Sequence, residues 1–312
     1  MYTDIGTKSA RKSLSVKGVK MLKKSRKTVR ERVISWLFLL PSVLGVSLFF
    51  FIPFIIIVYY SLIDGVVTKN FVGLENFKML FNNAAFMMAA RNTLVFSLMA
   101  VVSAVVISLL FAIMLEAKIP AKSKMRTFLL SPLVVPTASV ILIWQVVFSY
   151  NGSFNSFLSL FGVEAIDWMK SDYSKIVVLL LFLWKNIGYN MVLFTAALSS
   201  VPKDQLEAAQ VDGAGAVRRF FKIKLRYISP SLFFVSLLSL INSFKIFREV
   251  YLLTGGYPYE SIYFLQHFMN NTFKSLDYQK LSAASVIMSA FIVVVIFIVF
   301  LLEDRFGKDV EE

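Results

Sequence analysis

Polar side chains recur at helical spacing inside two apolar segments of this 312-residue chain. Asn186, Tyr189 and Asn190 stand at positions i, i+3 and i+4 of the first segment. The second segment carries a comparable stripe, which comprises Ser236, Ser239, Asn242, Ser243 and Lys245. Carboxamides, hydroxyls and aromatic rings suit a neutral polyhydroxylated ligand, because it needs hydrogen bonds to its hydroxyl groups and an apolar surface for its ring faces. The stripes indicate either a site for a sugar-like solute or hydrogen bonds between helices.

Few other residues have the types and spacing that catalysis needs. The chain has no Cys and a single His, His267, which we interpret as a loop residue rather than a metal ligand. The sequence contains no phosphate-binding GxxxxGK(S/T) pattern, no GxSxG nucleophile motif and no zinc-ligand spacing. We therefore expect no enzymatic activity, no metal site and no cofactor in this chain.

The elements that position these side chains are membrane-spanning helices. The chain is 57% hydrophobic and only 17% charged, a balance typical of a protein whose solvent is the bilayer. Six apolar segments are long enough to span, namely residues 34–62, 93–115, 127–149, 176–198, 229–253 and 283–302. The sequence therefore predicts an all-α integral membrane protein with six transmembrane helices.

Prolines and charges mark irregular places in these spans. Pro132 and Pro136 predict a kink or tilt in the third span, as Pro41 and Pro53 do in the first. A second group, Lys245, Arg248 and Glu249, lies toward the outer end of the fifth span. Snorkelling to the membrane surface is the ordinary explanation for charges at such a position.

The distribution of basic residues predicts the orientation. Residues 1–33 form a basic tail, residues 34–305 the transmembrane domain, and residues 306–312 a short second tail. With the N-terminus inside, 23 Lys and Arg residues lie on the cytoplasmic side and seven on the outer side. This bias predicts a multi-pass protein with both termini cytoplasmic. The basic tail either binds anionic lipid headgroups or is a topology signal with a flexible end; we favour the topology signal, and no nucleic-acid partner is expected.

A polar, basic loop at residues 200–227, between the fourth and fifth spans, is predicted to be cytoplasmic. Pro202 and Asp204 suit the first turn of a helix over about 202–212, and Gly213 and Gly215 permit a backbone turn after it. A second, amphipathic helix follows, with one apolar face formed by Val217, Phe220, Phe221 and Leu225. The spacing alone fits an interfacial helix as well as a docking element for a partner protein.

The loop reads EAAQVDGAGAVRRFFKIKL at 207–225 and resembles the coupling loop of ATP-binding-cassette (ABC) importer permeases. Further segments resemble the sugar-permease subunits of binding-protein-dependent importers and keep that family's order along residues 34–305. These segments are FVGLENF at 71–77, RNTLVFS at 91–97, WKNIGYNMVLF at 184–194, and the SFK and LTGG stretch at 243–256. One departure is Arg226, where the family commonly has proline after the leucine.

The resemblance implies the partners and the sites. It implies a location in the bacterial-type plasma (inner) membrane. It also implies a second permease subunit, two ABC ATPase subunits that bind ATP and Mg, and an extracytoplasmic solute-binding protein. Contact with the ATPase is implied through Glu207, Ala208, Ala209, Asp212 and Gly213. A sugar pocket is implied at Trp184, Asn186, Ile187, Gly188, Met191, Ser239, Asn242 and Ser243. ATP-driven closure of the ATPase dimer would rock the spans and expose the central site alternately on each side of the membrane.

Two other classes of protein remain open at this stage. An ion- or proton-coupled secondary transporter of a polar solute would explain Lys185 and the polar stripes, but not the spacing of the 207–225 loop. A membrane enzyme or receptor scaffold is the third possibility. Transport by the chain alone would support the secondary transporter, and activity without ATPase partners would support the third class.

Overall fold

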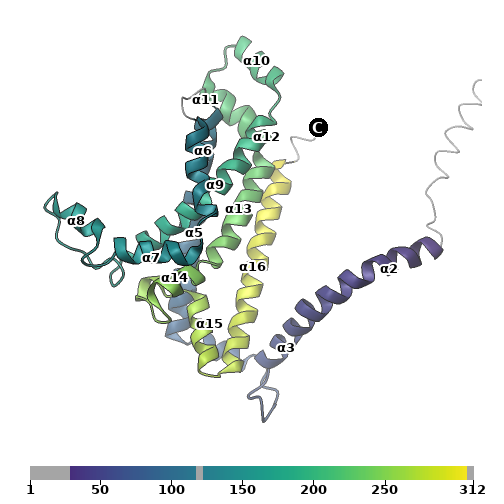
Figure 1. The fold of residues 1–312 in the computed structure, drawn as a ribbon. Helices are drawn as coiled ribbons and strands as arrows, with labels where there is room; N and C mark the ends of the chain where they lie inside the picture. The colour runs from purple at the N-terminus through teal and green to yellow at the C-terminus, as the bar shows by residue number, and fades with distance from the viewer. Residues whose placement is uncertain (1–28, 117–121, 308–312) are drawn as a thin grey trace, which may run out of the picture. The chain divides into compact units, whose positions relative to one another are not determined.

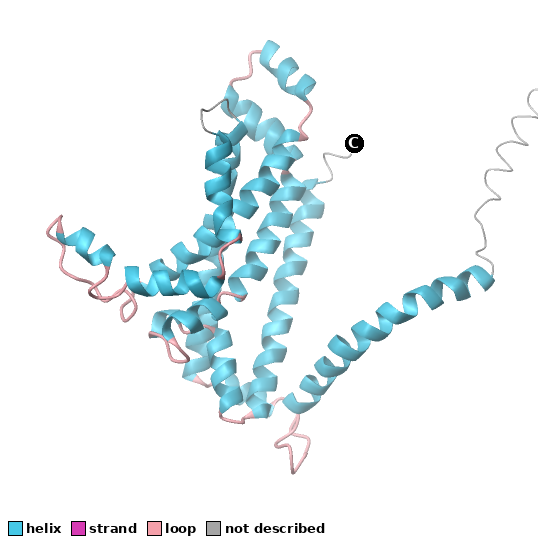
Figure 2. Ribbon diagram, in the orientation of Figure 1, coloured by secondary structure: helices cyan, strands magenta, loops and turns pink. Residues whose placement is uncertain are grey.

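The computed structural model describes residues 29–116 and 122–307, most of which are helical (Figures 1 and 2). The basic residues 1–28 and the C-terminal residues 308–312, which belong to the two predicted tails, lie outside the described residues. The chain divides into two compact units, residues 1–56 and 57–312. Five described helices are long and apolar enough to cross a membrane, and a sixth span is present if one bent helix pair counts as one. The predicted all-α membrane fold is confirmed.

The first span is helical from α2 (Val29–Val46) through a π-helical turn, η1 (Ser47–Phe51), to α3 (Ile52–Ser61). The N–H of Ile52 bonds to the carbonyl of Ser47, five residues back, directly before Pro53. Proline lacks the N–H that a regular helix needs, and a wider turn accommodates this loss. The predicted irregularity at Pro53 therefore takes the form of a π-helical turn.

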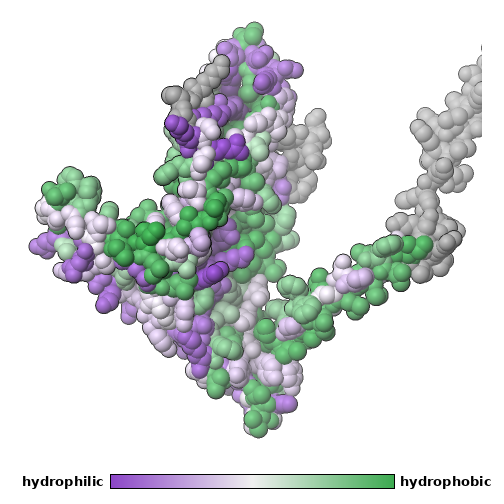
Figure 3. Space-filling view, in the orientation of Figure 1, coloured by the Kyte–Doolittle hydropathy of each residue, from purple (hydrophilic) through white to green (hydrophobic). Residues whose placement is uncertain are grey.

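The helices of the second unit follow one another along the chain (Figure 1). They are α4 (Glu75–Phe81), α5 (Ala84–Glu116), α6 (Lys122–Leu130), η2 (Ser131–Leu133), α7 (Thr137–Val147), α8 (Ser153–Ser159), α9 (Ser174–Ser199), α10 (Lys203–Val211), α11 (Ala216–Arg219), η3 (Phe220–Lys224), α12 (Leu225–Tyr227), α13 (Ser229–Phe244), α14 (Phe247–Thr254), η4 (Glu260–Ile262), α15 (Leu265–Lys274) and α16 (Tyr278–Gly307). Figure 3 shows hydrophilic residues concentrated around α10 and α11 and hydrophobic residues over α7 and much of α16.

The core of this unit lies where α5 packs against α9 and α13. Ala100, Ala104, Ser108 and Ala112, spaced four residues apart on α5, are all fully buried. Small residues at this spacing form a flat strip along one side of a helix, so that a neighbouring helix can approach closely. Phe182 and Phe194 of α9 are also fully buried and fill the space on either side of the strip.

The third span is broken rather than kinked. Helices α6 and η2 meet α7 at an angle of 98° across residues 134–136. Pro136 caps α7 in an extended conformation, which a continuous helix does not allow, and Pro132 lies in the preceding 3-10 turn. The helix pair is held against α9 at Gly188, where a Cβ atom would lie only 1.9 Å from the carbonyl oxygen of Leu129.

Two further boundaries differ from the sequence prediction. Helix α5 begins at Ala84, nine residues before the predicted start, because its first turns pack against α15 through Phe86 and Ala89. There the amide of Asn92 donates to the carbonyls of Glu260 and Tyr263. The fifth span, Ser229–Thr254, is interrupted by a two-residue break at 245–246, between α13 and α14, and is not sharply bent as the third span is. This break places Lys245 at a helix terminus.

Candidate functional site

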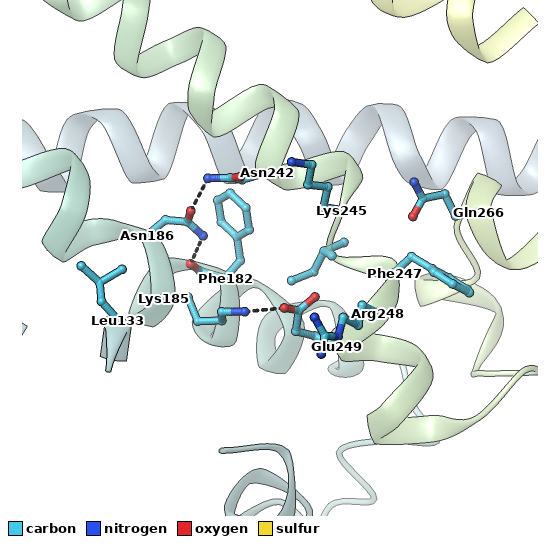
Figure 4. Close-up of a pocket in the computed structure, with 11 residues that line it drawn as sticks. Leu133, Phe182, Lys185, Asn186, Asn242, Lys245, Phe247, Arg248, Glu249 and Gln266 are labelled. Carbon is cyan, nitrogen blue, oxygen red and sulfur yellow. Dashed lines mark hydrogen bonds and ion pairs between the residues drawn. The ribbon is translucent and has the colours of Figure 1, made fainter. Parts of the chain in front are cut away.

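A cavity of about 510 Å³ lies between α9, α13 and α14 (Figure 4). Its lining comprises Leu133, Phe182, Lys185, Asn186, Asn242, Lys245, Ile246, Phe247, Arg248, Glu249 and Gln266. The cavity forms beside the turn between α13 and α14, and the charged residues Lys245, Arg248 and Glu249 line it together with residues of α9. Most of the residues that line the cavity are polar, although α9, α13 and α14 belong to apolar spans.

Lys185 of α9 and Glu249 of α14 form an ion pair on the wall of the cavity (Figure 4). The Glu249 residue is only 7% exposed, and Lys185 also lies within hydrogen-bonding range of the Thr137 hydroxyl at 3.5 Å. A carboxylate away from water is stable only when it is paired, so this contact joins the fourth span to the fifth. Glu249 therefore does not snorkel to the surface, and the sequence-based explanation is wrong for this residue.

Two predicted pocket residues, Asn186 and Asn242, lie in the cavity wall and bond to each other. The amide of Asn242 donates to Oδ1 of Asn186 at 2.9 Å, and the amide of Asn186 donates to the Phe182 carbonyl at 2.8 Å. A carboxamide has two donor hydrogens and an acceptor oxygen, so each side chain retains capacity for a further bond. Oδ1 of Asn242 accepts no hydrogen bond from any described residue. The pair is therefore suited to bind hydroxyl groups.

Lys245 and Arg248 form the second charged feature of the cavity. They lie three residues apart across the turn between α13 and α14, and both are exposed in the cavity wall. Neither side chain makes an ion pair or hydrogen bond with another residue in the described part of the chain. Since Lys185 and Glu249 compensate each other, the cavity carries two uncompensated positive charges.

The other six predicted pocket residues lie in the packing between helices. The Trp184 ring packs on Trp144 with centroids 5.7 Å apart, Ile187 packs on the α5–α9 core, and Met191 is fully buried. Gly188 provides the contact with Leu129, while Ser239 bonds to Asn190 at 2.8 Å and Ser243 to Ser97 at 2.9 Å. The hydrogen bonds between helices that the sequence left as an alternative are thus present at Ser239 and Ser243.

His267 occupies the first turn of α15 rather than a loop, and it is fully buried. Its Nδ1 accepts the N–H of Phe264 at 3.3 Å, and its ring contacts the Phe247 ring with centroids 4.7 Å apart. Nε2 has no partner within the described residues. Burial lowers the pKa of His267 to about 4, so the ring is neutral at physiological pH. The predicted loop location is therefore wrong for this residue.

The loop at residues 200–227 forms a separate candidate site. Helix α10 begins after Pro202 and ends at Val211, close to the predicted 202–212. Gly213 has a φ of +78°, a left-handed conformation that favours glycine, and it reverses the chain as predicted. Glu207, Ala208, Asp212 and Gly213 are exposed and Ala209 is half-buried. Leu206 packs on the helix core, so α10 is attached along one edge and presents its other side outward.

The second half of the loop differs from the predicted amphipathic helix. Val217 and Phe221 are 71% and 61% exposed, whereas Ile223 and Leu225 pack on the helix core. Residues 220–224 form a π-helical turn, which is wider than an α-helical turn and rotates the apolar positions after it. The helix continues through Arg226 to Tyr227, and Pro230 follows in the first turn of α13. The missing proline is thus compensated four residues later.

The loop is also tied to the end of α5. Nζ of Lys224 lies 2.6 Å from both carboxylate oxygens of Glu116, the last described residue of that helix. Because α12 leads into α13 through the fully buried Ile228, the loop contacts two spans at its base. A displacement of the loop would therefore be transmitted to α5 and α13.

Sequence reasoning missed the partnership of Lys185 with Glu249 and the position of Gln266 in the cavity. A basic residue in one apolar span and an acidic residue in the next were the signal for the ion pair. Their contact depends on the break between α13 and α14, which no proline or glycine announces. Gln266 lies outside the predicted spans, and no pattern in the sequence pointed to it.

These features define a multi-pass helical membrane protein with a polar cavity between its spans and an exposed, glycine-turned loop between the fourth and fifth. The family of binding-protein-dependent transport system inner membrane components matches residues 118–312. The chain belongs to this family. The predicted resemblance to importer permeases is confirmed.

Individual relatives agree with this assignment. The chain is 33% identical over 281 residues to the sn-glycerol-3-phosphate transport system permease protein UgpA of Escherichia coli O6:K15:H31 (strain 536), covering 88% of this chain and 95% of the relative. It is 32% identical over 275 residues to UgpA of Pectobacterium atrosepticum, covering 86% and 93%. The fold is similar to a chain of a bacterial ABC transporter that imports the acidic polysaccharide alginate, with a TM-score of 0.76, 19% identity, and coverage of 89% and 98%.

Proposed function

We propose that this chain is the membrane-spanning permease subunit of an ABC importer, and that it translocates a carbohydrate or a related polyhydroxylated solute. A solute-binding protein outside the membrane delivers the solute, and ATP hydrolysis on two partner subunits drives the transport. A second permease subunit completes the pathway. The single observation that carries the proposal is the exposed loop around Gly213, in a chain whose family serves binding-protein-dependent transport.

The loop has the properties of a docking surface for the ATPase. Small side chains at Ala208 and Ala209 allow a partner to approach the helix closely, and Glu207 offers a charge at the same edge. A cavity of about 310 Å³ lies next to them and is lined by Arg218, Arg219 and Lys222. Of the side chains of α10, only Leu206 packs on the chain's own core. An exposed surface with little internal packing is the expected state of a surface that a partner covers.

The proposed mechanism couples this loop to the cavity. Closure of the ATPase dimer would displace α10, and the contacts of Lys224 with Glu116 and of α12 with α13 would transmit the displacement to the spans. Helix α13 ends beside the cavity at Asn242 and Lys245. Movement of α13 would therefore change access to the cavity while the solute contacts on α9 stay in place. The ATPase side is the cytoplasmic side, as the distribution of basic residues predicts.

The solute class follows from the cavity and from the relatives. Asn186 and Asn242 hold carboxamides with free bonding capacity, which suits hydroxyl groups, and Phe182 and Phe247 supply apolar surface. The relatives at 32–33% identity are named for sn-glycerol-3-phosphate, a derivative of a polyhydroxylated compound. In this proposal Ser239, Ser243, Met191, Ile187 and Trp184 support the cavity from behind, and they would contact solute only after a rearrangement.

Co-purification from mild detergent tests the docking loop. We expect wild-type chain to retain an ABC ATPase and a second permease, and the Glu207→Lys, Gly213→Asp double variant to lose the ATPase. Aspartate tolerates a left-handed conformation better than most residues, and a Cβ at Gly213 meets no atom within 4 Å, so the fold should persist. Ala208→Arg is a second variant that alters the surface without touching Gly213.

The matched control is Lys170→Glu, which reverses an exposed charge in the loop between α8 and α9. It should retain both partners. Wild-type chain that purifies without an ATPase, or loop variants that keep it, would contradict the proposal.

A further inference from the structure

We propose that the solute of this permease carries a negatively charged phosphate or carboxylate group, and that Lys245 and Arg248 bind this group. The inference rests on the proposed transport function and names the solute class of the same cavity. It follows from the charge of the cavity wall, where these two side chains have no partner among the described residues.

Two of the charged side chains in the cavity wall, Lys185 and Glu249, neutralise each other. Lys185 pairs with Glu249, which is buried, so neither is available to a ligand without leaving the other unpaired. Breaking such a pair is costly, because it leaves an isolated charge away from water. The Lys185–Glu249 pair is therefore part of the wall rather than of the binding group.

Lys245 and Arg248 are the two cations of the cavity wall that have no partner among the described residues. Lys245 directly follows the last residue of α13, Arg248 lies in the first turn of α14, and both line the same cavity. Basic residues within spans are costly unless they meet water, a carboxylate or a ligand of opposite charge. A lysine is a point charge with three donors and an arginine a planar fork, and together they match the oxygens of a phosphate or carboxylate.

The cavity wall also holds groups that can bind the neutral part of the solute. Asn186 and Asn242 lie in the same wall, bonded to each other, with Oδ1 of Asn242 unoccupied (Figure 4). A solute with its acidic group on the two cations can place a hydroxyl group at this carboxamide pair. The volume of about 510 Å³ accommodates a small sugar acid or polyol phosphate, or one unit of a longer acidic chain.

Binding of two acid probes and their neutral counterparts to the purified full chain, in nanodiscs of uncharged phosphatidylcholine, tests the inference. The pairs are sn-glycerol 3-phosphate with glycerol, and a galacturonate disaccharide with a galactose disaccharide. Trp184 is adjacent in sequence to Lys185 of the cavity wall and packs on Trp144, so tryptophan fluorescence provides the readout. We expect at least one acid to bind at least about tenfold more tightly than its neutral counterpart.

The variants assign the charge to residues. Lys245→Gln and Arg248→Gln should each weaken binding of the acid by about tenfold or more, while the charge-conserving Lys245→Arg should retain it. Lys170→Gln removes a charge outside the cavity and should leave binding unchanged. Equal binding of acid and neutral probes, binding of neither acid, or undiminished binding by the Lys245→Gln, Arg248→Gln double variant would overturn the inference.

A second readout separates this inference from the proposed function. ATP hydrolysis by the assembled importer should rise with the acid probe and lose that response in the double variant. Stimulation by neutral probes alone would overturn the anionic solute and preserve the importer. Acid binding that requires both cations in a chain that never associates with an ATPase would preserve the anion site and contradict the importer. Loss of the second permease from the double variant would instead assign the two cations to a subunit interface, and would overturn the inference.

Discussion

The cavity between α9 and α14 and the loop around Gly213 are both rich in charged residues. They differ in whether the carboxylates are paired within the chain. In the cavity wall, Glu249 is buried and bonded to Lys185, and the carboxamides of Asn186 and Asn242 are bonded to each other. In the loop, Glu207 and Asp212 are exposed and make no side-chain hydrogen bond or ion pair with another described residue. The charges of the cavity wall are thus organised by contacts inside this chain, whereas these two carboxylates of the loop are not.

Residues that stabilise the fold and residues that contact a partner are therefore expected in different regions of the chain. Residues of the cavity wall join one span to another, so changes there alter the free energy of unfolding. Glu207 and Ala208, which are exposed on α10, make no side-chain hydrogen bond or ion pair with another described residue, so changes there should alter mainly contacts with a partner. Substitutions in the cavity wall and in the loop should therefore differ in their effect on the free energy of unfolding.

The largest effect is expected at the ion pair. Glu249→Gln leaves Lys185 without a carboxylate inside the spans and should destabilise the chain by about 3–5 kcal/mol. Thermal unfolding in detergent, followed by loss of the monodisperse species, measures this effect. The double variant Lys185→Met, Glu249→Met should recover most of the stability, because it removes both charges. A Glu249→Gln chain as stable as wild type would show that the cavity wall does not depend on this pair.

A pH effect of nearly the same size is expected at His267. Burial lowers its pKa to about 4 from 6.5, so the unfolded chain takes up the proton first as the pH falls. The stability is therefore full above pH 6.5 and is lost progressively toward pH 4, by up to about 3 kcal/mol. Tyr263, the titratable ring packed on it, has a pKa raised by burial and stays neutral in this range.

His267→Asn separates this residue from other acid-sensitive groups. Asparagine keeps an acceptor for the Phe264 N–H and removes the titrating ring. The difference in melting temperature between variant and wild type should narrow, or reverse sign, as the pH is lowered from 7.5 to 4.5. A difference that is constant with pH would contradict the assigned cause.

A smaller effect is expected at the contact between α9 and the broken span. Gly188→Ala places a Cβ 1.9 Å from the Leu129 carbonyl oxygen, so the backbones must separate, at a cost of about 1–3 kcal/mol. Gly45→Ala is the matched control, because a Cβ there meets no atom within 4 Å. Melting temperatures of the two variants in the same detergent provide the comparison. Equal melting temperatures would show that α6 and α9 are not in close contact.

The smallest effect on stability is expected at the base of the loop. Lys224→Gln removes the pair with Glu116, whose side chain is 37% exposed, and should cost at most about 1 kcal/mol. If the loop transmits motion through this contact, the variant should keep its ATPase partner while solute-stimulated ATP hydrolysis falls. A large loss of stability would show instead that the loop base belongs to the core.

The sequence predicted the regular parts of this fold well. Apolar length predicts the spans, Pro132 and Pro136 predict irregularity in the third, and Pro202 with Gly213 predicts α10 and its turn. In each case the cause is local, because a proline removes a donor and a glycine permits a left-handed residue. Local causes are visible in a single sequence.

The site was predicted less completely, because its geometry depends on contacts between distant spans. Helical spacing identified Asn186 and Asn242, but the same spacing also selected Ser239 and Ser243, which bond to other helices. Only packing decides which polar residue faces a neighbour and which faces the cavity. The break after Phe244, which turns Glu249 toward Lys185, likewise has no local signal.

Site-directed crosslinking tests whether the loop at residues 200–227 contacts an ABC ATPase. The chain has no native cysteine, so a single Ala208→Cys carries a photoactivatable maleimide at one defined position in membranes that hold all partners. Tyr257→Cys, 82% exposed in the segment after α14, is the matched control at the opposite predicted side. We expect Ala208→Cys to form an adduct with an ABC ATPase subunit and Tyr257→Cys to form none. No ATPase adduct from Ala208→Cys, or the same adduct from both positions, would contradict this expectation.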